Sequence, residues 1–497
     1  MRLLFDPNSM ESYRQFIKLK SIPKYEWAGR MAIIPDEYAH LFTRRKAKVK
    51  SLPYEPSEFL FDYQRDISRM AIERKKFSVF AQPGMGKTLI FLEYARHVTK
   101  CLKPNQSVLI VSPLMVVEQT IEETIRFYGE DENTPVYVQS SKLQAWMNDH
   151  GGHRIAITNY EAIREGLTIG NVGCLILEES STLKNMTASW ATRLIDLGRG
   201  LEWKSCYTGT PAPNDEIEYA NHAVFMDHKK TTNEFLASYF INRGQTDNRW
   251  EMKGHARTRF YSDLSHWCIF LSNPATYGWK DNCNTLPPIH IHVERIDLTD
   301  EQRKLAQLET GTMFATHVGG IGQRGRLSQI AKGKNGIATN KPAYIKNMVD
   351  GFNGESTIVW CKYDDEQSQM ERTFPEARSI KGQTPHETRM QYIREFKASE
   401  RQIMISKAKC LGLGLNLQVA RRHVFSGISD SYEEFVQCVK RSNRIGSEFD
   451  LHVHIPITEL EEPMMQNVLR KAGRVEHEIR EQEMFFKKNN HFARSGK

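Results

Sequence analysis

The chain has 497 residues, with 68 Lys and Arg against 60 Asp and Glu, so its formal net charge is +8. Hydrophobic residues make up 40% and charged residues 26%, a balance that suits a folded globular protein and excludes wholesale disorder. No uncharged apolar run approaches the ~18 residues that a membrane span requires, so we expect no membrane partner.

The eight cysteines are scattered and none forms a C-x-x-C pair, which argues against structural zinc and against a dense disulfide framework. Asp6 interrupts the apolar stretch at the N-terminus, so a secretory signal is not expected. We therefore predict a reducing, cytoplasmic location, which would be the host cytoplasm for a viral protein. The mild basic excess permits a nucleic-acid partner without demonstrating one.

Residues 1–55 are predicted to form an N-terminal accessory segment. It ends in the basic run RRKAKVK (44–50). Two interpretations of this run stay open, a solvated linker or helix face and a contact to phosphates.

From residue 56 to about 215, short apolar runs alternate with helical patterns. The runs that predict buried strands are FSVFA, SVLIVSP, RIAITN, GCLILEE and KSCYTGT. The same alternation returns later in STIVWCK, QIMISKA, RRHVFSG and LHVHIPI. Strands separated by helices predict a parallel, doubly wound sheet, so we expect an α/β protein with two such domains.

A glycine-rich loop with the sequence Q-P-G-M-G-K-T (82–88) follows the first predicted strand and precedes a helical pattern. In this context the two glycines let backbone N–H groups turn toward phosphate oxygens. Lys87 would reach the β- and γ-phosphates, and Thr88 would ligate Mg²⁺. A glycine-rich turn is the alternative. The predicted nucleotide-binding residues here are Pro83, Gly84, Met85, Gly86, Lys87 and Thr88.

Two adjacent carboxylates, Glu178 and Glu179, stand at the end of the predicted strand GCLIL. In this kind of fold the tip of such a strand faces the phosphate loop. Glu178 could then hold Mg²⁺, and Glu179 could orient and deprotonate the attacking water. The alternative is a solvated acidic strand end, which we would prefer if the phosphate loop were not present.

The predicted domain limits are 56–290 and 291–461. Within the first, residues 215–290 are less regular and are predicted to form an insertion of helices and loops. Residues 462–497 carry apolar positions at helical spacing and are predicted to form a C-terminal helix that packs on the protein.

Residues 310–349 contain no acidic residue but six basic ones. Arg324 and Arg326 are the candidates in this stretch for a phosphate backbone, and a loop with solvated charges is the alternative. Elsewhere, His290 and His292, and likewise His452 and His454, alternate along a strand pattern. No Cys or carboxylate cluster with ligand spacing completes either pair, so we expect no metal site there.

The acidic pair begins a longer pattern. The sequence EESSTLKN (178–185) resembles the D-E-x-H-x-x-K-N box of the Swi/Snf-type ATPases of helicase superfamily 2. Other motifs of that family follow in order, as FDYQ (61–64), VSPLMVVEQ (111–119), ITNYEAI (157–163), YTGTPAPN (207–214), LTDEQRKL (298–305), TIVWCKY (357–363), KAKCLGLGLNLQVA (407–420) and QCVKRSNRIGS (437–447). The resemblance covers about residues 56–460.

This resemblance implies two RecA-like lobes with ATP and Mg²⁺ in the cleft between them. It implies that Arg441 and Arg444 stabilise the transition state from the opposite lobe, Arg444 being the better candidate for an arginine finger. An amphipathic helix with a basic face is the alternative. Other nucleotide-site residues implied by the family are Gln64, which would read adenine, Gln437 and Gly414.

The family also implies residues that join the two lobes or touch nucleic acid. Thr208, Gly209 and Thr210 would link the state of ATP to lobe movement. The residues implied for a nucleic-acid strand are Ser112, Pro113, Thr158 and Asn416. For the first three of these, a role in capping a strand end is the alternative.

Two departures from the family box stand out. Glu178 replaces the usual Asp and is one methylene longer, which bears on magnesium geometry. Ser181 replaces the histidine that couples nucleotide state to the facing lobe, which puts the strength of coupling in question.

The sequence thus predicts a nucleic-acid motor, and the resemblance favours translocation along double-stranded DNA. A strand-separating DNA or RNA helicase is the first alternative. A nucleic-acid-binding scaffold with a weakened ATPase, serving a nuclease or a recombination or replication partner, is the second. The compact length resembles the small prokaryotic or viral members of the group.

Overall fold

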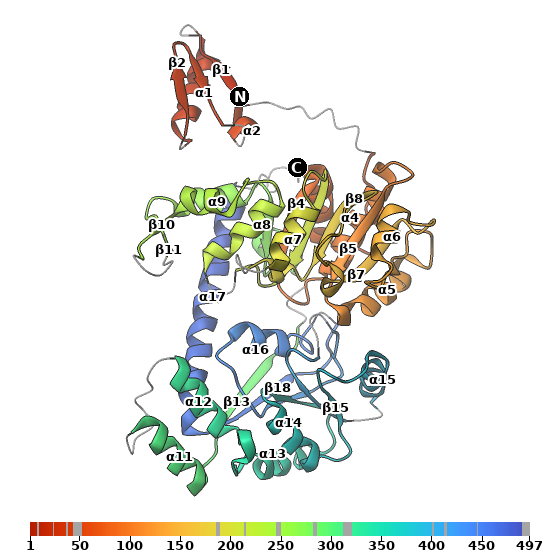
Figure 1. Cartoon of the computed structure of the whole chain (residues 1–497), viewed down its shortest axis with the longest axis vertical. Helices are drawn as coiled ribbons and strands as arrows, with labels where there is room; N and C mark the ends of the chain where they lie inside the picture. Colours follow the sequence, from red (N-terminus) through yellow and green to blue (C-terminus); the bar gives the residue numbers. More distant parts are fainter. Residues whose placement is uncertain are drawn as a thin grey trace.

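The computed structural model has two α/β lobes, one above the other, with a small unit at the N-terminal end (Figure 1). The structure describes residues 1–6, 9–22, 24–35, 38–42, 52–184, 189–212, 215–244, 250–281, 286–311, 321–399, 402–411, 415–444 and 446–489.

The first lobe is built on a seven-stranded parallel sheet with the order β12-β4-β9-β8-β5-β7-β6. Its strands are β4 (Lys76–Ala81), β5 (Ser107–Ser112), β6 (Val136–Tyr137), β7 (Ile155–Asn159), β8 (Val172–Glu178), β9 (Trp203–Thr208) and β12 (Cys268–Leu271). The helices and 3₁₀ turns between the strands are α3 (Asp62–Arg74), α4 (Lys87–Cys101), α5 (Leu114–Tyr128), α6 (Leu143–Asn148), η2 (Tyr160–Ala162), η3 (Ser180–Lys184) and α7 (Ser189–Leu197). The central strands are buried along their whole length, as in a sheet covered on both faces.

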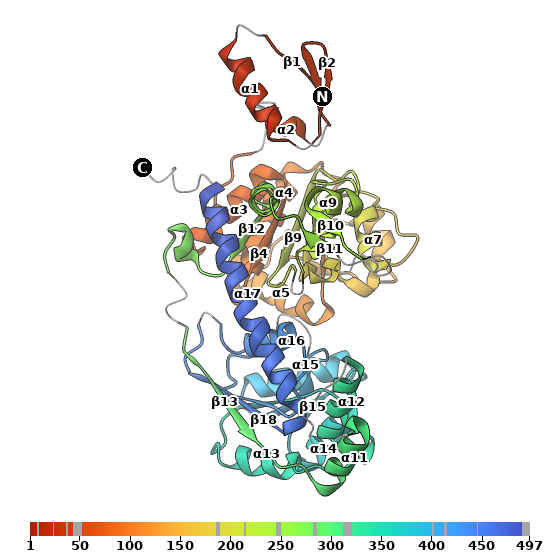
Figure 2. The same cartoon turned by 90° about the vertical axis from the view of Figure 1, so that its left-hand side faces the viewer.

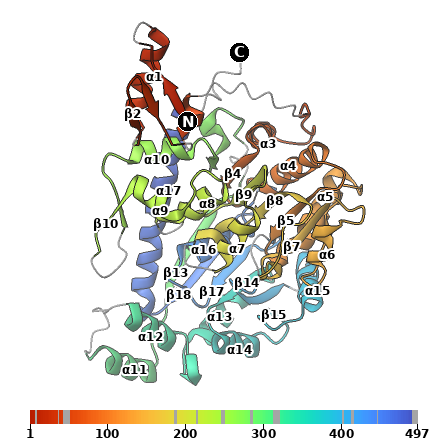
Figure 3. The ribbon, with the colours of Figure 1, turned by 45° about the horizontal axis from the view of Figure 1, so that its top comes forward.

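The second lobe is built on a six-stranded parallel sheet with the order β13-β18-β17-β14-β16-β15, most of which can be followed in Figure 3. Its strands are β13 (Ile289–Arg295), β14 (Thr357–Cys361), β15 (Arg378–Ile380), β16 (Ile403–Lys407), β17 (Arg422–Phe425) and β18 (Leu451–Ile457). Its helices and 3₁₀ turns are α11 (Asp300–Thr310), α12 (Ile321–Ala331), η6 (Lys334–Gly336), α13 (Lys341–Asp350), α14 (Asp364–Thr373), α15 (His386–Lys397), α16 (Tyr432–Val439) and η7 (Glu459–Glu461).

Each of the nine apolar runs predicted as a strand forms one, and both sheets are parallel, so the predicted α/β fold with two doubly wound lobes is confirmed. Strands β6, β12 and β15 were not predicted. β6 and β15 span only two and three residues, too few to show a pattern.

Residues 215–281 contain more than the expected insertion of helices and loops. They form η4 (Glu216–Glu218), α8 (Tyr219–Phe225), α9 (Thr232–Tyr239), the hairpin of β10 (Phe240–Asn242) and β11 (Trp250–Met252), α10 (Arg257–Leu264), β12 and η5 (Pro274–Tyr277). Strand β12 pairs with β4 and closes the edge of the first sheet. This part of the chain therefore belongs in part to the core of the first lobe.

The N-terminal unit is a three-stranded antiparallel sheet with one main helix. It consists of β1 (Arg2–Leu4), α1 (Met10–Lys20), β2 (Glu26–Ala28), β3 (Met31–Ile33) and α2 (Ala39–Phe42). Leu3, Leu19, Ile22 and Ala32 form a small core of its own. The basic run 44–50 lies outside the described residues.

The basic stretch 310–349 is largely helical where it is described. Leu327 and Ile330 of α12 pack on Leu298 and Leu460, so this face is buried. The interpretation of this stretch as a loop is wrong for α12, because burying these apolar side chains fixes the helix on the lobe. Contact of Arg324 and Arg326 with a phosphate backbone stays a prediction. Residues 312–320 lie outside the described residues.

A helix of 28 residues, α17 (Glu462–Asn489), runs alongside both lobes (Figures 1 and 2). Near its start Met465 and Val468 pack in the core of the second lobe. Near its end Phe486 packs in the core of the first lobe, with its ring 5.0 Å from that of Phe270. Across the residues that the structure describes, neither α17 nor any other helix has the length and apolar character needed to span a lipid bilayer.

The histidines of β13 and β18 face one another across the parallel pairing. The His290 and His452 rings lie 4.8 Å apart, and those of His292 and His454 lie 4.6 Å apart. His454 Nδ1 lies 3.1 Å from Glu294 Oε1. Within the described part of the chain, no three His, Cys, Asp or Glu side chains are arranged to hold a metal ion.

Candidate functional site: a cavity between the two lobes

The glycine-rich loop joins β4 to α4 at the carboxyl edge of the first sheet. Gly84 has φ +92° and Gly86 has φ +62°, conformations that a glycine adopts without strain. A Cβ on Gly86 would lie 2.3 Å from Gln64 Nε2, so a larger residue there would displace the Gln64 side chain. Lys87 begins α4, is buried, and donates to Ala81 O at 2.9 Å.

A cavity of about 420 Å³ lies in front of this loop and is lined by both lobes. In the first lobe the cavity is lined by α3, the glycine-rich loop, the start of α4, part of α5 and the tip of β8. From the second lobe it takes residues of the segments 415–418 and 437–446. The predicted residues that line it together are Gln64, Pro83, Gly84, Gly86, Lys87, Thr88, Glu178, Glu179, Asn416, Gln437, Arg441 and Arg444.

Gln64 is held by the protein itself. Its Oε1 accepts from Phe61 N at 3.0 Å, and its Nε2 donates to Gly86 O at 3.4 Å. The predicted adenine-reading residue therefore also ties α3 to the phosphate loop. Tyr63 OH donates to Met85 O at 3.1 Å, which anchors the loop from beneath while Met85 itself is buried.

Glu178 is the last residue of β8 and is buried. Burial raises the pKa of its carboxyl group to about 8, against the opposing effect of the hydrogen bond that Ser112 Oγ donates to Oε2 at 2.7 Å. Tyr160 OH donates to Glu178 O at 2.6 Å and fixes the strand end.

Glu179 adopts φ +48°, a left-handed conformation that costs a non-glycine residue on the order of 1 kcal/mol or more. Thr208 Oγ1, at the end of β9, donates to Glu179 Oε2 at 3.2 Å. The strained backbone and this hydrogen bond turn the carboxylate into the cavity beside the loop.

Arg441 and Arg444 reach the cavity from the second lobe. Arg444 packs on the loop, since a Cβ on Gly84 would lie 3.6 Å from Arg444 Cα. Burial and, to a lesser extent, the neighbouring charge of Arg441 together lower the pKa of Arg444 to about 10. Burial also lowers the pKa of Arg441 and that of Lys87, and the charge of Arg444 acts on Lys87 in the same direction.

The side chains of Lys87 and Arg441 are buried and that of Arg444 is half-buried, and all three cations line one cavity, an arrangement that suits a polyanion. The triphosphate of ATP fits this arrangement, because the glycine loop supplies backbone N–H groups at a helix N-terminus. Thr88 and Glu178 supply the oxygen ligands that Mg²⁺ prefers. The residues present thus fit ATP with Mg²⁺.

Other predicted residues lie outside this cavity. Ser112 and Thr158 are fully buried, and Thr158 Oγ1 donates to Val138 O at 2.7 Å, so both hydroxyl groups face the protein interior. This geometry favours the alternative of strand-end capping. Arg326 of α12 pairs with Glu309 of α11 at 2.5 Å, and Arg324 also lies on α12. Pro113 precedes α5 as its N-cap. Gly414 lies outside the described residues.

The predicted coupling residues lie at the end of β9. A Cβ on Gly209 would meet Pro83 Cδ at 2.8 Å, so this glycine packs on the phosphate loop. Thr210 Oγ1 donates to Glu433 Oε1 at 2.8 Å, which crosses from the first lobe to the second. A second crossing contact joins Asn416 N to Gln119 Oε1 at 3.2 Å.

Sequence reasoning missed Glu433 and Gln119. Their partners are 223 and 297 residues away along the chain, so no local pattern could show them. Gln119 ends the segment VSPLMVVEQ, which resembles a family motif, but the motif does not show that its side chain contacts the second lobe.

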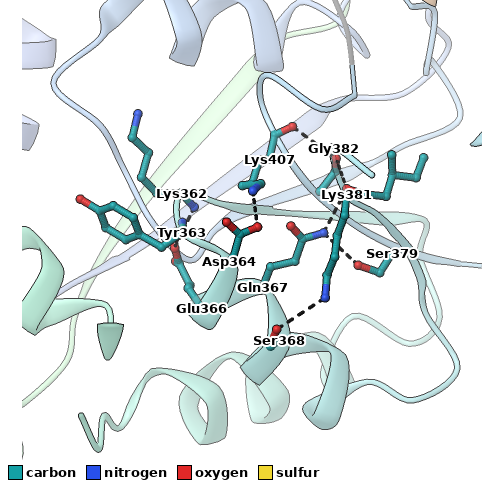
Figure 4. Close-up of polar contacts among 12 residues, drawn as sticks. Lys362, Tyr363, Asp364, Glu366, Gln367, Ser368, Ser379, Lys381, Gly382 and Lys407 are labelled. Atoms are coloured by element: carbon teal, nitrogen blue, oxygen red, sulfur yellow. Dashed lines mark hydrogen bonds and ion pairs between the residues drawn. The ribbon is translucent and has the colours of Figure 1, made fainter. Parts of the chain in front are cut away.

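A group of lysines follows the strand ends of the second sheet and was also missed. Lys362 follows β14, Lys381 follows β15, and Lys407 ends β16 (Figure 4). Each has a carboxylate partner, namely Glu434 for Lys362 at 3.1 Å, Glu371 for Lys381 at 2.8 Å, and Asp364 for Lys407. Each of these three strands has a lysine at its end, but this shared position can be recognised only when the sheet is known.

The chain is similar to two known protein families. The SNF2-related domain family matches residues 78–337, and the helicase conserved C-terminal domain family matches residues 340–446. The chain is 22% identical to the DNA annealing helicase and endonuclease ZRANB3 of Mus musculus over 469 residues, which cover 88% of this chain and 41% of that protein. The chain therefore spans about two fifths of the length of this relative.

A second relative is putative protein p41 of Acyrthosiphon pisum secondary endosymbiont phage 1. It is 23% identical over 392 residues, which cover 72% of this chain and 82% of that protein. Among solved structures, the Sulfolobus solfataricus SWI2/SNF2 ATPase core in complex with dsDNA is 17% identical, with a TM-score of 0.38. That match covers 82% of this chain and 89% of that chain.

Proposed function

The chain belongs to the SNF2-related family of Swi/Snf-type ATPases in helicase superfamily 2, and from this premise we propose that it is an ATP-driven motor that translocates along double-stranded DNA. The observation that carries the proposal is the cavity in which Lys87 of one lobe and Arg441 and Arg444 of the other surround one site. Because neither lobe alone supplies all three cations, binding and hydrolysis of a nucleotide would depend on how the lobes meet.

Each group in the cavity has a chemical task. Lys87 and the loop N–H groups would bind the phosphates, and Thr88 and Glu178 would hold Mg²⁺, which neutralises phosphate charge when bound. Glu179 would accept the proton of the attacking water. Arg441 and Arg444 would stabilise the charge that develops on the transferred phosphoryl group.

Glu178 must lose a proton before it can hold Mg²⁺. Burial raises the pKa of its carboxyl group to about 8, so the group is largely protonated at pH 7 without a metal ion. A divalent cation favours its ionised form, so metal binding would release a proton from this residue.

Double-stranded DNA as the track is supported by the family and by the name of the mouse relative, a DNA annealing helicase. Lys362, Lys381 and Lys407 at the carboxyl edge of the second sheet offer a surface for phosphates. Each would exchange its carboxylate partner for a phosphate when the polymer binds. The predicted limit at 290 falls inside β13, which pairs with β18 of the second sheet, so we propose the described parts of 56–288 and 289–461 as the two motor lobes.

Steady-state ATP hydrolysis tests the proposal. Wild type and Lys87→Ala are compared without polymer and with duplex DNA, single-stranded DNA or RNA. We expect duplex DNA to raise turnover at least about tenfold and Lys87→Ala to abolish it, since the variant loses the phosphate-binding cation. Stimulation chiefly by single strands would instead support a strand-separating helicase, and absence of turnover with every polymer would support the scaffold alternative.

A further inference from the structure

Glu433 of α16 is a residue of the second lobe that contacts the first lobe beside the acidic pair. Helix α16 lies at the top of the second lobe, next to the first lobe (Figures 1 and 2). The side chain of Glu433 is 14% exposed and contacts two residues of the first lobe. Lys184 Nζ donates to its Oε2 at 2.6 Å, and Thr210 Oγ1 donates to its Oε1 at 2.8 Å.

The contact with Thr210 continues to the reaction centre through two further hydrogen bonds. The backbone N–H of Thr210 donates to Thr208 Oγ1 at 3.2 Å. Thr208 Oγ1 in turn donates to Glu179 Oε2 at 3.2 Å. Three hydrogen bonds in series therefore join the carboxylate of Glu433 to the carboxylate proposed to deprotonate water.

Within the second lobe, the Glu433 carboxylate also contacts a residue that lines the nucleotide cavity. Gln437, one turn further along α16, donates from Nε2 to Glu433 Oε1 at 3.2 Å and lines the cavity. Lys184, the other partner of Glu433, ends η3, which directly follows Glu178 and Glu179. Glu433 thus joins the segment after the acidic pair, the end of β9 and the cavity wall of the second lobe.

The contacts of Glu433 matter more because this chain lacks the histidine of the family's acidic box. Ser181 stands there, and the hydrogen bond recorded for its hydroxyl group is to Glu179 O at 3.5 Å, within the first lobe. The described polar contacts that cross between lobes near the acidic pair instead converge on Glu433.

We propose that Glu433 is a positioning residue that orients Glu179 through Thr210 and Thr208, so that rapid hydrolysis requires contact between the two lobes at α16. This inference rests on the proposed function of the cavity. When the lobes separate, Thr210 loses its acceptor, so the two hydrogen bonds that lead from Thr210 through Thr208 to Glu179 are no longer held from the second lobe and Glu179 is oriented less tightly.

The test uses the full-length chain and four substitutions. Glu433→Ala removes every contact of the carboxylate, and Glu433→Gln keeps an oxygen for Thr210 but loses the charge that attracts Lys184. Thr210→Val removes the hydroxyl group at nearly constant volume. Glu395→Ala is the matched control, because Glu395 is a carboxylate of the second lobe with 16% exposure that pairs with Arg378 at 2.5 Å within the same lobe.

The first readout is the split between kcat and KM for ATP. We expect Glu433→Ala to lower kcat about tenfold while KM changes less than about twofold, because the residue positions the base and does not touch the nucleotide. Glu433→Gln should lose less, and Glu395→Ala should match wild type. The double variant Glu433→Ala/Thr210→Val should be no slower than the slower single variant, since both break the same series of bonds.

The second readout is hydrogen–deuterium exchange of the peptide that contains Thr208 and Thr210, which needs no ATP turnover. We expect faster exchange in Glu433→Ala and wild-type exchange in Glu395→Ala. Unchanged exchange, independent effects of the two single variants on kcat, or a kcat equal to that of wild type would overturn the proposal. If wild type itself hydrolyses no ATP, the proposed function fails, and the exchange result alone then decides whether Glu433 orders the end of β9.

Discussion

Single residues in the cavity carry separable tasks, because each reaches it from a different element. Glu179 lies at the tip of β8, Lys87 at the start of α4, and Arg444 beyond the end of α16. Substitutions at these positions should therefore change different kinetic quantities.

The change Glu179→Gln tests the general base. Gln has the size of Glu and can still accept from Thr208, but it cannot take a proton from water. We expect turnover to fall at least about a hundredfold while the Kd for a fluorescent ATP analogue stays within about threefold of the wild-type value. Normal ATP turnover in this variant would remove Glu179 from the role of base.

The change Arg444→Lys tests the charge that the second lobe contributes. Lysine keeps the positive charge but loses the planar fork that can contact two phosphate oxygens at once. We expect kcat to fall by about a hundredfold, which is less than the ~10³–10⁵ that an arginine finger contributes because lysine keeps the charge, with a smaller change in ATP affinity. A kcat equal to that of wild type would refute the finger role and favour a helix that merely presents a basic face.

Elements of the second lobe are joined by a fully buried ion cluster. Glu461 of η7 pairs with Lys341 at 2.7 Å and with Lys332 at 3.2 Å, and all three side chains are at most 2% exposed. Lys341 also donates to Ser426 O at 2.6 Å. The cluster ties the segment 332–341 to β17 and η7, so two of the six basic residues in the stretch 310–349 serve the interior of the lobe.

The change Glu461→Gln should destabilise the protein by about 3–5 kcal/mol, because it leaves two buried ammonium groups without this counter-charge. Urea unfolding of the chain measures the effect. The matched control is Glu462→Gln, which breaks an exposed pair with Arg295 at 2.9 Å and should cost less than about 1 kcal/mol. Equal midpoints for the two variants would contradict a structural role for the cluster.

The Glu461 carboxyl group also makes the free energy of unfolding depend on pH. Burial alone would raise the pKa of Glu461, but the charges of Lys341 and Lys332 hold it below its ordinary value of 4.5. Its stabilising contribution is therefore fully present above pH 4.5 and is lost as pH falls through the lower folded-state value. The buried His222 and His423, with pKa values of about 4 and 3, also disfavour acid, so the difference between wild type and Glu461→Gln isolates the cluster.

At the scale of the whole molecule, the sequence predicted most of what is local and little of what joins distant segments. Central strands such as β5 and β8 are continuous apolar runs because helices cover both faces, so they could be recognised without the structure. Strand β12 could not, because its four apolar residues lie among helices and pair with β4, which lies 190 residues earlier in the chain (268 − 78).

In the candidate site, too, the sequence predicted the local motifs but not the contacts between distant segments. The phosphate loop and the acidic pair were visible because each is a short motif at a strand end. Glu433 was not, because its role depends on Lys184 and Thr210 in the other lobe. Lys332 and Lys341 gave a misleading signal, since a basic residue paired inside the protein looks the same in sequence as one that faces solvent.

The central claim is that ATP turnover between the lobes drives movement along duplex DNA, and triplex displacement tests it most directly. A third strand is annealed to a duplex, and its release is followed with wild type and with Lys87→Ala, alongside a strand-separation assay on the same duplex. The account predicts ATP-dependent release of the third strand by wild type alone, with the duplex left intact. ATP hydrolysis without release of the third strand, or release only with separation of the duplex, would contradict it.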